Sequence, residues 1–426
     1  VNIMAGIPGN SKYVKKLNRL AVLKLLKEQE MISRQQLAER SGLTPPAVTG
    51  IVRELLTMGL VEEIGLGHSQ GGRKPVKLRL NSSAGYVLGV ELSSYEAVIS
   101  MADLKYRPGN ICSLALDMTA PEHGLAQLTE GIRDYLAGPA AKGKKIMGLG
   151  VAFPGLLQLG QGMVRNAVNL GPLWNDFPIK KILEEDLGVP VFLEVNSKAG
   201  VLAEKWFGGG RGCENLVYVN LGEGISAGVM VQGEILQGYQ GHAGQIGHLV
   251  LAEEGPVCRC GNRGCLESLC GIPALMRRIH QDIDTLSDDD ALRTIWETQG
   301  SIRFDDLLRV AAVSPYTDAL FHNVGRYIGL ALANVINLYN PEVVFLGGRM
   351  APAMERVLEI VEVVVKTHAF PAVFAGSSLK ISELGRDSAV IGACALVLRE
   401  FFHSTRSNML DDGWPELPAA RKLRER

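Results

Sequence analysis

The sequence predicts an α/β protein that carries a small helical head, and three observations support this fold class. Apolar spacing and turn residues near the N-terminus follow the pattern of a winged helix-turn-helix. From residue 86 onward, short apolar runs rich in β-branched residues alternate with helical stretches. A later loop gathers three cysteines and a histidine. We therefore expect a winged helix-turn-helix at 1–82, an α/β body at 83–402 and a C-terminal extension at 403–426.

Capping and turn residues indicate where the helices of the head begin and end. After a first helix with regularly spaced leucines, Ser33 and Gln36 form a capping-box pattern that starts a short second helix. Gly42 can take a positive φ in the turn that follows. Thr44 then caps a third helix, whose first turn accepts the two prolines after it. The segment Thr44–Met58 is therefore the expected recognition helix.

Two strands after this helix complete the expected wing. They are Leu60–Ile64 and Val76–Leu80, and the connection between them contains Gly71-Gly72-Arg73-Lys74-Pro75. A narrow, extended and cationic tip of this kind suits an A·T-rich minor groove. A plain flexible linker is the alternative.

The charge of the head favours a polyanionic partner. Residues 1–80 contain 13 Lys and Arg against 6 Asp and Glu, whereas the whole chain has a formal net charge of −1. A basic head on an acidic body is typical of nucleic-acid binding; a three-helix head without a DNA role is the alternative. The expected DNA contacts are Ser33, Arg34, Thr44, Pro45, Thr49, Arg53, Arg73 and Lys74, with Lys15 and Lys16 as further phosphate contacts.

Strand-like and helical runs alternate through the body, which predicts layers of helices on a sheet. The expected strands are Tyr86–Leu92, Ile146–Val151, Val191–Val195, Leu216–Asn220 and Val343–Leu346. The expected helices include Lys198–Phe207, Ala319–Leu338 and Asp387–Phe402.

The cysteine-rich loop has the composition of a zinc site. Cys258, Cys260 and Cys265 lie within eight positions, and His248 lies ten residues upstream of the first. Zinc binds four such ligands in a closed tetrahedron, and Cys3His is one of its structural ligand sets. We expect a structural Zn²⁺, because no further group offers itself for an activated water. A set of reduced, unliganded cysteines is the alternative.

A family resemblance appears in the same segment. The residues that carry it are Gly244-Gln245-Ile246-Gly247-His248 and then Cys258-Arg-Cys260-Gly-Asn-Arg-Gly-Cys265-Leu-Glu267. This pattern resembles the signature of the ROK family of sugar kinases and sugar-responsive repressors, and the resemblance covers residues 83–400. It implies an actin-like, ribonuclease H-type body whose two lobes hold a sugar between them. With its head, the chain is similar to the xylose- and N-acetylglucosamine-type repressors of the family.

A sugar kinase of this family needs three features, and the chain departs from each. The phosphate loop, Asp-x-Gly-Gly-Thr in the kinases, reads Glu91-Leu-Ser93-Ser-Tyr95 and lacks both glycines. Ser197, a poor base, replaces the catalytic aspartate. The second phosphate hairpin, Gly-Thr-Gly in the kinases, contains the charged Glu223. We expect no enzyme activity; an active ATP-dependent sugar kinase with a DNA-binding head is the alternative.

The sugar side of the cleft keeps more of the family pattern. The resemblance implies hydroxyl contacts from Asn169, Asn196, Ser197, Gln245, His248 and Glu267. It also gives His248 two roles, one ring nitrogen on zinc and the other toward the sugar. Gln245 stands where the family has Glu, so a charge-assisted bond becomes a neutral one. Asn196 as a simple helix cap and Glu267 as a solvated helix-start acid are the alternatives.

Composition predicts the cellular compartment and argues against a membrane-spanning segment. Hydrophobic residues make up 46% of the chain and charged residues 21%, as in ordinary globular proteins. The apolar runs fall far short of the ~20 residues of a membrane span, and the N-terminus has no signal pattern. Seven cysteines, three of them in one metal-type group, favour the cytoplasm over a disulfide framework.

The sequence therefore predicts a cytoplasmic, sugar-responsive regulator of carbohydrate genes, most simply a repressor. Its expected partners are operator DNA, a sugar or sugar phosphate, and further copies of the chain in a homodimer or homotetramer. A sugar-transport protein is the alternative effector, and no membrane contact is expected.

Overall fold

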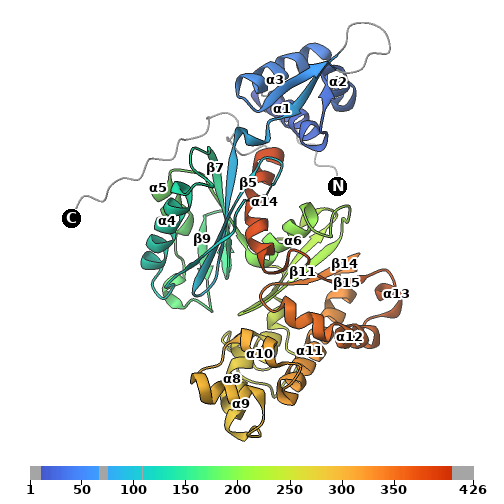
Figure 1. Cartoon of the computed structure of the whole chain (residues 1–426). Coiled ribbons are helices and arrows are strands. Elements are labelled where there is room, and N and C mark those ends of the chain that lie inside the picture. The colour runs from blue at the N-terminus through green and yellow to red at the C-terminus, as the bar shows by residue number, and fades with distance from the viewer. Residues whose placement is uncertain (1–10, 67–74, 108, 405–426) are drawn as a thin grey trace, which may run out of the picture.

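The computed structural model describes residues 11–66, 75–107 and 109–404. A small head sits on a body of two lobes, and each lobe is built around its own five-stranded sheet (Figure 1). Within the part of the chain that is described, no helix is both long and apolar enough to cross a membrane.

The head packs three helices against a three-stranded sheet. The helices are α1 (Ser11–Glu28), α2 (Arg34–Ser41) and α3 (Pro45–Thr57), and the strands, in sheet order, are β1 (Ile32–Ser33), β3 (Val76–Leu80) and β2 (Val61–Leu66). β2 and β3 form the antiparallel hairpin predicted for the wing. Its tip lies outside the described residues.

The signals around the turn between α2 and α3 are confirmed in part. Ser33 and Gln36 form the predicted capping box, and Gly42 takes a φ of 70°. Thr44 occupies the N-cap position of α3 with extended backbone, but its side chain accepts no cap hydrogen bond. Prolines in the first turn remove N–H groups that an N-cap oxygen would accept from. The predicted side-chain cap at Thr44 is therefore wrong.

The first lobe comes next along the chain. Its sheet has the order β10 (Val191–Val195), β7 (Ile146–Phe153), β4 (Tyr86–Leu92), β5 (Glu96–Asp103) and β6 (Cys112–Ala115). β4, β5 and β6 form an antiparallel meander, and β4, β7 and β10 are parallel. The lobe also contains α4 (Pro121–Ala137), α5 (Ile179–Leu187) and the hairpin of β8 (Leu156–Gln158) and β9 (Met163–Asn166).

The second lobe repeats this topology. Its sheet has the order β13 (Glu234–Ile235), β12 (Ile225–Val231), β11 (Leu216–Leu221), β14 (Val343–Gly347) and β15 (Ser378–Ile381). Here too a three-stranded meander continues into two parallel strands. The helices of this lobe are α7 (Leu266–Cys270), α8 (Ile272–Asp282), α9 (Ala291–Gln299), α10 (Phe304–Val310), α11 (Pro315–Tyr339), α12 (Ala351–His368) and α13 (Pro371–Phe374).

Two helices, α6 (Asn196–Trp206) and α14 (Ser388–His403), lie between the two sheets and pack on each other (Figure 1). Glycine makes this packing possible. A Cβ at Gly392 of α14 would lie 1.9 Å from the carbonyl oxygen of Ala199 in α6. A Cβ at Gly150 of β7 would lie 1.9 Å from the carbonyl oxygen of Ala393. A larger residue at either position would push α14 away from its neighbours, so the joint between the lobes is closely packed.

The head shares a hydrophobic core with the body. One cluster contains Leu55 of α3 together with Val87 of β4 and Phe401 of α14. A polar contact reinforces it, because the ammonium group of Lys27 in α1 lies 3.7 Å from the ring centroid of Trp206, the last residue of α6. The head is therefore mounted on the first lobe and on the two central helices.

All strands and helices predicted for the body are present, and their ends differ from the prediction by at most four residues. The largest difference is at α11, which begins at Pro315 because Ser314 caps it and proline is tolerated in the first turn. β5 and β12 have no predicted counterpart, since polar or small residues interrupt their apolar runs.

Candidate functional site

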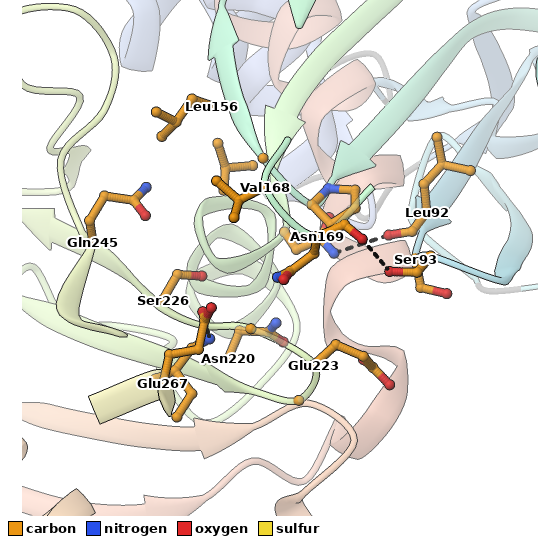
Figure 2. Close-up of a pocket in the computed structure, with 18 of the residues that line it drawn as sticks. Leu92, Ser93, Leu156, Val168, Asn169, Asn220, Glu223, Ser226, Gln245 and Glu267 are labelled. Carbon is orange, nitrogen blue, oxygen red and sulfur yellow. Dashed lines mark hydrogen bonds between the residues drawn. The ribbon is translucent and has the colours of Figure 1, made fainter. Parts of the chain in front are cut away.

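A cavity of about 170 Å³ lies between the lobes, at the ends of β4, β7 and β10 and beside the turn from β11 to β12 (Figure 2). Amides, hydroxyls and a few charged groups face it from both lobes, which is the kind of lining that binds a small polyhydroxylated molecule. Its polar members include Glu91, Ser93, Asn166, Asn169, Asn196, Asn220, Glu223, Ser226, Gln245, His248, Glu267 and Arg349.

Five of the six residues expected to contact a sugar line this cavity, namely Asn169, Asn196, Gln245, His248 and Glu267. Ser197 lies outside the lining, and its side chain is buried. One helical residue turns the side-chain direction by about 100°, so the first turn of α6 presents Asn196 to the cavity and directs Ser197 away. The structure therefore does not support Ser197 as a sugar contact.

Asn196 has an unused acceptor. Its Nδ2 donates to the carbonyl oxygen of Leu92, 3.3 Å away, while Oδ1 is buried without a hydrogen-bond partner among the described residues. Val195 holds the N-cap position of α6, so Asn196 is not a simple helix cap. A buried carbonyl oxygen without a partner costs free energy until a donor reaches it, and a ligand hydroxyl can supply one.

Asn169 and Glu267 both approach Gly224 on the side where a Cβ would point. Asn169 Nδ2 and Glu267 Oε2 each lie 3.1 Å from the point that a Cβ at Gly224 would occupy. Glu267 Oε2 accepts from the N–H of Ile225 at 2.9 Å, and burial raises the pKa of this carboxyl. The carboxyl is thus an enclosed acceptor and not a solvated helix-start acid. A donor and an acceptor that converge beside a glycine suit adjacent hydroxyls.

Tyr95, Glu223 and Arg349 form a hydrogen-bonded group of which Glu223 and Arg349 line the cavity. Tyr95 Oη donates to Glu223 Oε1 at 2.8 Å, and Arg349 Nη1 donates to the same oxygen at 2.9 Å. Arg349 also contacts Tyr95 Oη. Tyr95 belongs to the first lobe and the other two to the second, so this group, which we call the interlobe triad, joins the lobes where the kinases are expected to hold phosphates.

Glu91 faces the cavity beside the interlobe triad. Burial, with the carboxylates of Asp387 and Glu223, raises the pKa of Glu91 to about 8. The group is therefore mostly a neutral acid at pH 7 and can donate a hydrogen bond. The sequence pattern marks this position only as a departure from the kinases.

The predicted metal ligands come together next to the cavity. The ligand atoms of His248, Cys258, Cys260 and Cys265 all lie within 4.8 Å of one another. Cys260 Sγ is 3.8 Å from Cys265 Sγ, and Cys258 Sγ is 3.8 Å from His248 Nδ1. Two thiolates at ~2.3 Å from a tetrahedral zinc are about 3.8 Å apart, so the residues fit this ion. We call residues 248–265 the metal loop.

The outer face of α3 and its N-cap present four of the eight DNA contacts predicted in the head besides Lys15 and Lys16. Thr44, Pro45, Thr49 and Arg53 are exposed. Thr49 Oγ1 donates to the carbonyl oxygen of Pro45 at 2.8 Å, which holds the hydroxyl against its own helix. Arg34 donates to Glu63 of the wing at 2.7 Å, so its charge is shared with that carboxylate.

Two predicted contacts are corrected and two lie beyond the described structure. The side chain of Ser33 is buried and its hydroxyl is used in the capping box, so it does not face DNA. Lys16 is buried to a similar degree, because α1 turns this face toward the core. Arg73 and Lys74 lie outside the described residues.

The profile of the ROK family matches residues 115–400, which is more than half of the chain. The chain belongs to the ROK family. The profile of the MarR family matches residues 16–63, which comprise most of the head. The expected combination of a helix-turn-helix head and an actin-like ROK body is therefore confirmed.

Curated relatives include repressors and a kinase. The xylose repressor of Caldicellulosiruptor bescii is 29% identical over 92% of this chain and 98% of its own length. The DNA-binding transcriptional dual regulator NagC of Escherichia coli is 30% identical over 92% and 94%. The glucokinase of Halalkalibacterium halodurans is 32% identical, but over 66% of this chain and 86% of its own length.

Solved structures agree with this division. A ROK family transcriptional regulator, described as a homolog of the Escherichia coli MLC protein, superposes with a TM-score of 0.78 at 28% identity. The superposition covers 92% of this chain and 97% of that one. The head and the body therefore both have counterparts in this regulator.

Proposed function

We propose that this chain is a sugar-responsive repressor of carbohydrate genes, in which residues 1–82 bind operator DNA and residues 83–402 bind the effector. The observation that supports this most is the extent of the matches. The two repressor-type relatives align with 92% of the chain, head and body together, whereas the glucokinase aligns with 66%. The exposed face of α3 and the polar interlobe cavity give each half a surface for its role.

The effector in this proposal is a sugar held by polar groups from both lobes. Asn196 Oδ1 accepts one hydroxyl, and Asn169 and Glu267 hold neighbouring hydroxyls beside Gly224. Gln245 and His248 complete the contacts from the second lobe. Paired donors and acceptors in a small concave site are what polyol recognition requires.

An active sugar kinase is the second candidate, because a glucokinase is among the relatives. The interlobe triad argues against it. Tyr95 and Glu223 occupy the expected phosphate positions, and Arg349, which could attract a phosphate, is already paired with Glu223. Ser197 stands buried at the position of the general base. We therefore propose that phosphoryl transfer has been lost.

Zinc is the metal that we propose for the metal loop, with His248, Cys258, Cys260 and Cys265 as its four ligands. A set of four protein ligands leaves no position for an activated water, which is the pattern of a structural site. His248 Nδ1 lies toward Cys258, so Nε2 is left for a hydroxyl in the cavity. When bound, the ion would fix the loop that forms this wall.

On the DNA side, α3 is the recognition helix in this proposal. Thr44, Pro45, Thr49 and Arg53 face the major groove, Arg34 contacts phosphate, and Arg73 and Lys74 belong to the wing. A homodimer, or a homotetramer built from dimers, would place two such helices about one turn of DNA apart. A sugar that favours a different arrangement of the lobes would change this spacing and release the operator.

DNA selected from a random pool with the purified protein tests the proposal. We expect a near-palindromic site, and we expect D-xylose, N-acetylglucosamine or one of their phosphates to weaken binding to it. Arg53→Ala should cost roughly 1–3 kcal/mol of DNA-binding free energy, whereas Arg277→Ala, an exposed arginine on α8, should cost none. Failure to select DNA would refute the proposal. Selection that no sugar affects would leave a protein effector, such as a transport component.

A further inference from the structure

Arg259 connects the metal loop to the sugar cavity. It lies between Cys258 and Cys260, and its Nη1 donates to Oδ1 of Asn169 at 3.0 Å. Asn169 follows β9 in the first lobe, whereas the metal loop belongs to the second. This hydrogen bond therefore joins the two lobes, between residues that are 90 positions apart.

The bond also determines which way the Asn169 amide points. A guanidinium group has donors and no acceptor, so only the amide oxygen can face it. Nδ2 is then turned toward Gly224, beside which Glu267 Oε2 also lies. Without Arg259 the amide is free to rotate, and donor and acceptor can exchange places. Asn169 is labelled among the lining residues in Figure 2.

The backbone at Arg259 is held in place by hydrogen bonds between neighbouring residues of the metal loop. Cys258 N donates to the carbonyl oxygen of Asn262 at 2.7 Å, and Gly261 N donates to that of Cys258 at 3.0 Å. The thiols on both sides of Arg259 belong to the four-ligand cluster. The backbone that carries the guanidinium therefore keeps its place as long as the cluster does.

We propose that Arg259 is a positioning residue for effector binding, which transmits the state of the metal loop to the Asn169 amide. Arg259 itself need not touch the effector. The inference rests on the proposed function in one respect, because it takes the effector to be a sugar bound beside Asn169. The contact between the lobes and its dependence on the metal loop do not require any effector.

Calorimetric titration of the full chain tests the role in binding. The probe is whichever of D-xylose, N-acetylglucosamine and glucose binds the wild type. Losing a charge-assisted hydrogen bond should lower the affinity of Arg259→Ala about tenfold, and Arg259→Lys should recover part of it. Arg263→Ala is the matched control, since Arg263 is exposed in the same loop. Equal affinity in Arg259→Ala and wild type would overturn the proposal.

A double-mutant cycle separates positioning from general damage. Asn169→Ala should lower affinity, and adding Arg259→Ala should lower it little further, because both changes remove one interaction. Arg259→Ala combined with Asn196→Ala should instead be additive. Additivity with both partners would contradict a role that acts through Asn169. Metal content measured on each variant confirms that the loop is still loaded.

Hydrogen exchange of the ligand-free protein gives a readout that needs no sugar. Arg259→Ala should speed exchange at residues 167–171, and Arg263→Ala should not. Removal of the metal by a chelator should have the same effect on the wild type but add little to Arg259→Ala. Unchanged exchange at 167–171 after metal removal would overturn the proposal even if a sugar binds. Failure of every sugar to bind, with the exchange result as expected, would count against the proposed function alone.

Discussion

Among single residues, Glu91 shows most clearly how position sets chemistry. It lies near the end of the first strand of an actin-like lobe, where a kinase has a metal-managing acid, yet burial and neighbouring carboxylates raise its pKa to about 8. A neutral acid does not attract a divalent cation, but it can donate to a hydroxyl. Its neighbour Tyr95 occupies the room in which a phosphate would lie. In the proposed function, a few side chains of this kind account for the loss of phosphoryl transfer.

The raised pKa of Glu91 predicts a pH dependence of stability. Below its ordinary pKa the carboxyl group is protonated in both the folded and the unfolded state, so it does not make stability depend on pH. As the pH rises from about 4.5 to 8, the unfolded chain ionises first, so the folded state loses stability. The free energy of unfolding of Glu91→Gln, measured in urea, should therefore rise by at least about 1 kcal/mol relative to that of wild type between pH 5 and pH 8. Glu122→Gln, a change at an exposed acid of α4, should show no such trend; parallel curves for Glu91→Gln and wild type would contradict the account.

Among the elements, α6 stands out because one of its ends lines the cavity and the other contacts the head. It begins with Asn196, which lines the cavity, and it ends with Trp206 under Lys27 of the head. α14 packs along it and reaches the core of the head through Phe401. A rigid helix of about 1.5 Å per residue moves as one body, so a shift at Asn196 reaches the head directly.

This arrangement predicts that Trp206→Ala uncouples sugar from DNA. Sugar affinity should stay within about threefold of wild type, because Trp206 lies at the far end of α6. The sugar-dependent loss of DNA affinity should shrink, because Lys27 of the head loses its contact with the Trp206 ring at the end of α6. Both affinities can be measured by titration. Trp296→Ala, in α9 away from the head, should keep the full response; an intact response in Trp206→Ala would show that α6 is not the route.

At the scale of the whole molecule, features whose residues are close in sequence could be predicted, whereas features whose residues meet only in the folded chain could not. The cluster of possible metal ligands could be found from sequence because its members lie within 18 positions and are typical ligands of one metal. The interlobe triad could not, because Tyr95 and Glu223 are 128 positions apart and meet only when the lobes pack. The same is true of Arg259 and Asn169. The duplicated sheet topology is also hidden, since strand order persists while the residues differ.

Local signals also fail where tertiary packing decides the outcome. The capping pattern predicts Ser33 correctly as a cap, but burial of the same hydroxyl removes it from the DNA surface. Ser197 is excluded from the cavity by one helical step after Asn196. Both errors arise because a motif gives a residue's position along the chain and not the direction of its side chain.

Above all, the interlobe cavity should bind a sugar and no longer transfer phosphate to it. Calorimetric titration of the full chain with D-xylose, N-acetylglucosamine, glucose and Mg-ATP, followed by analysis of the sugar for phosphate, tests this most directly. We predict that one sugar binds, that Mg-ATP does not, and that the sugar is recovered unchanged. Binding of Mg-ATP together with a phosphorylated sugar product would contradict it.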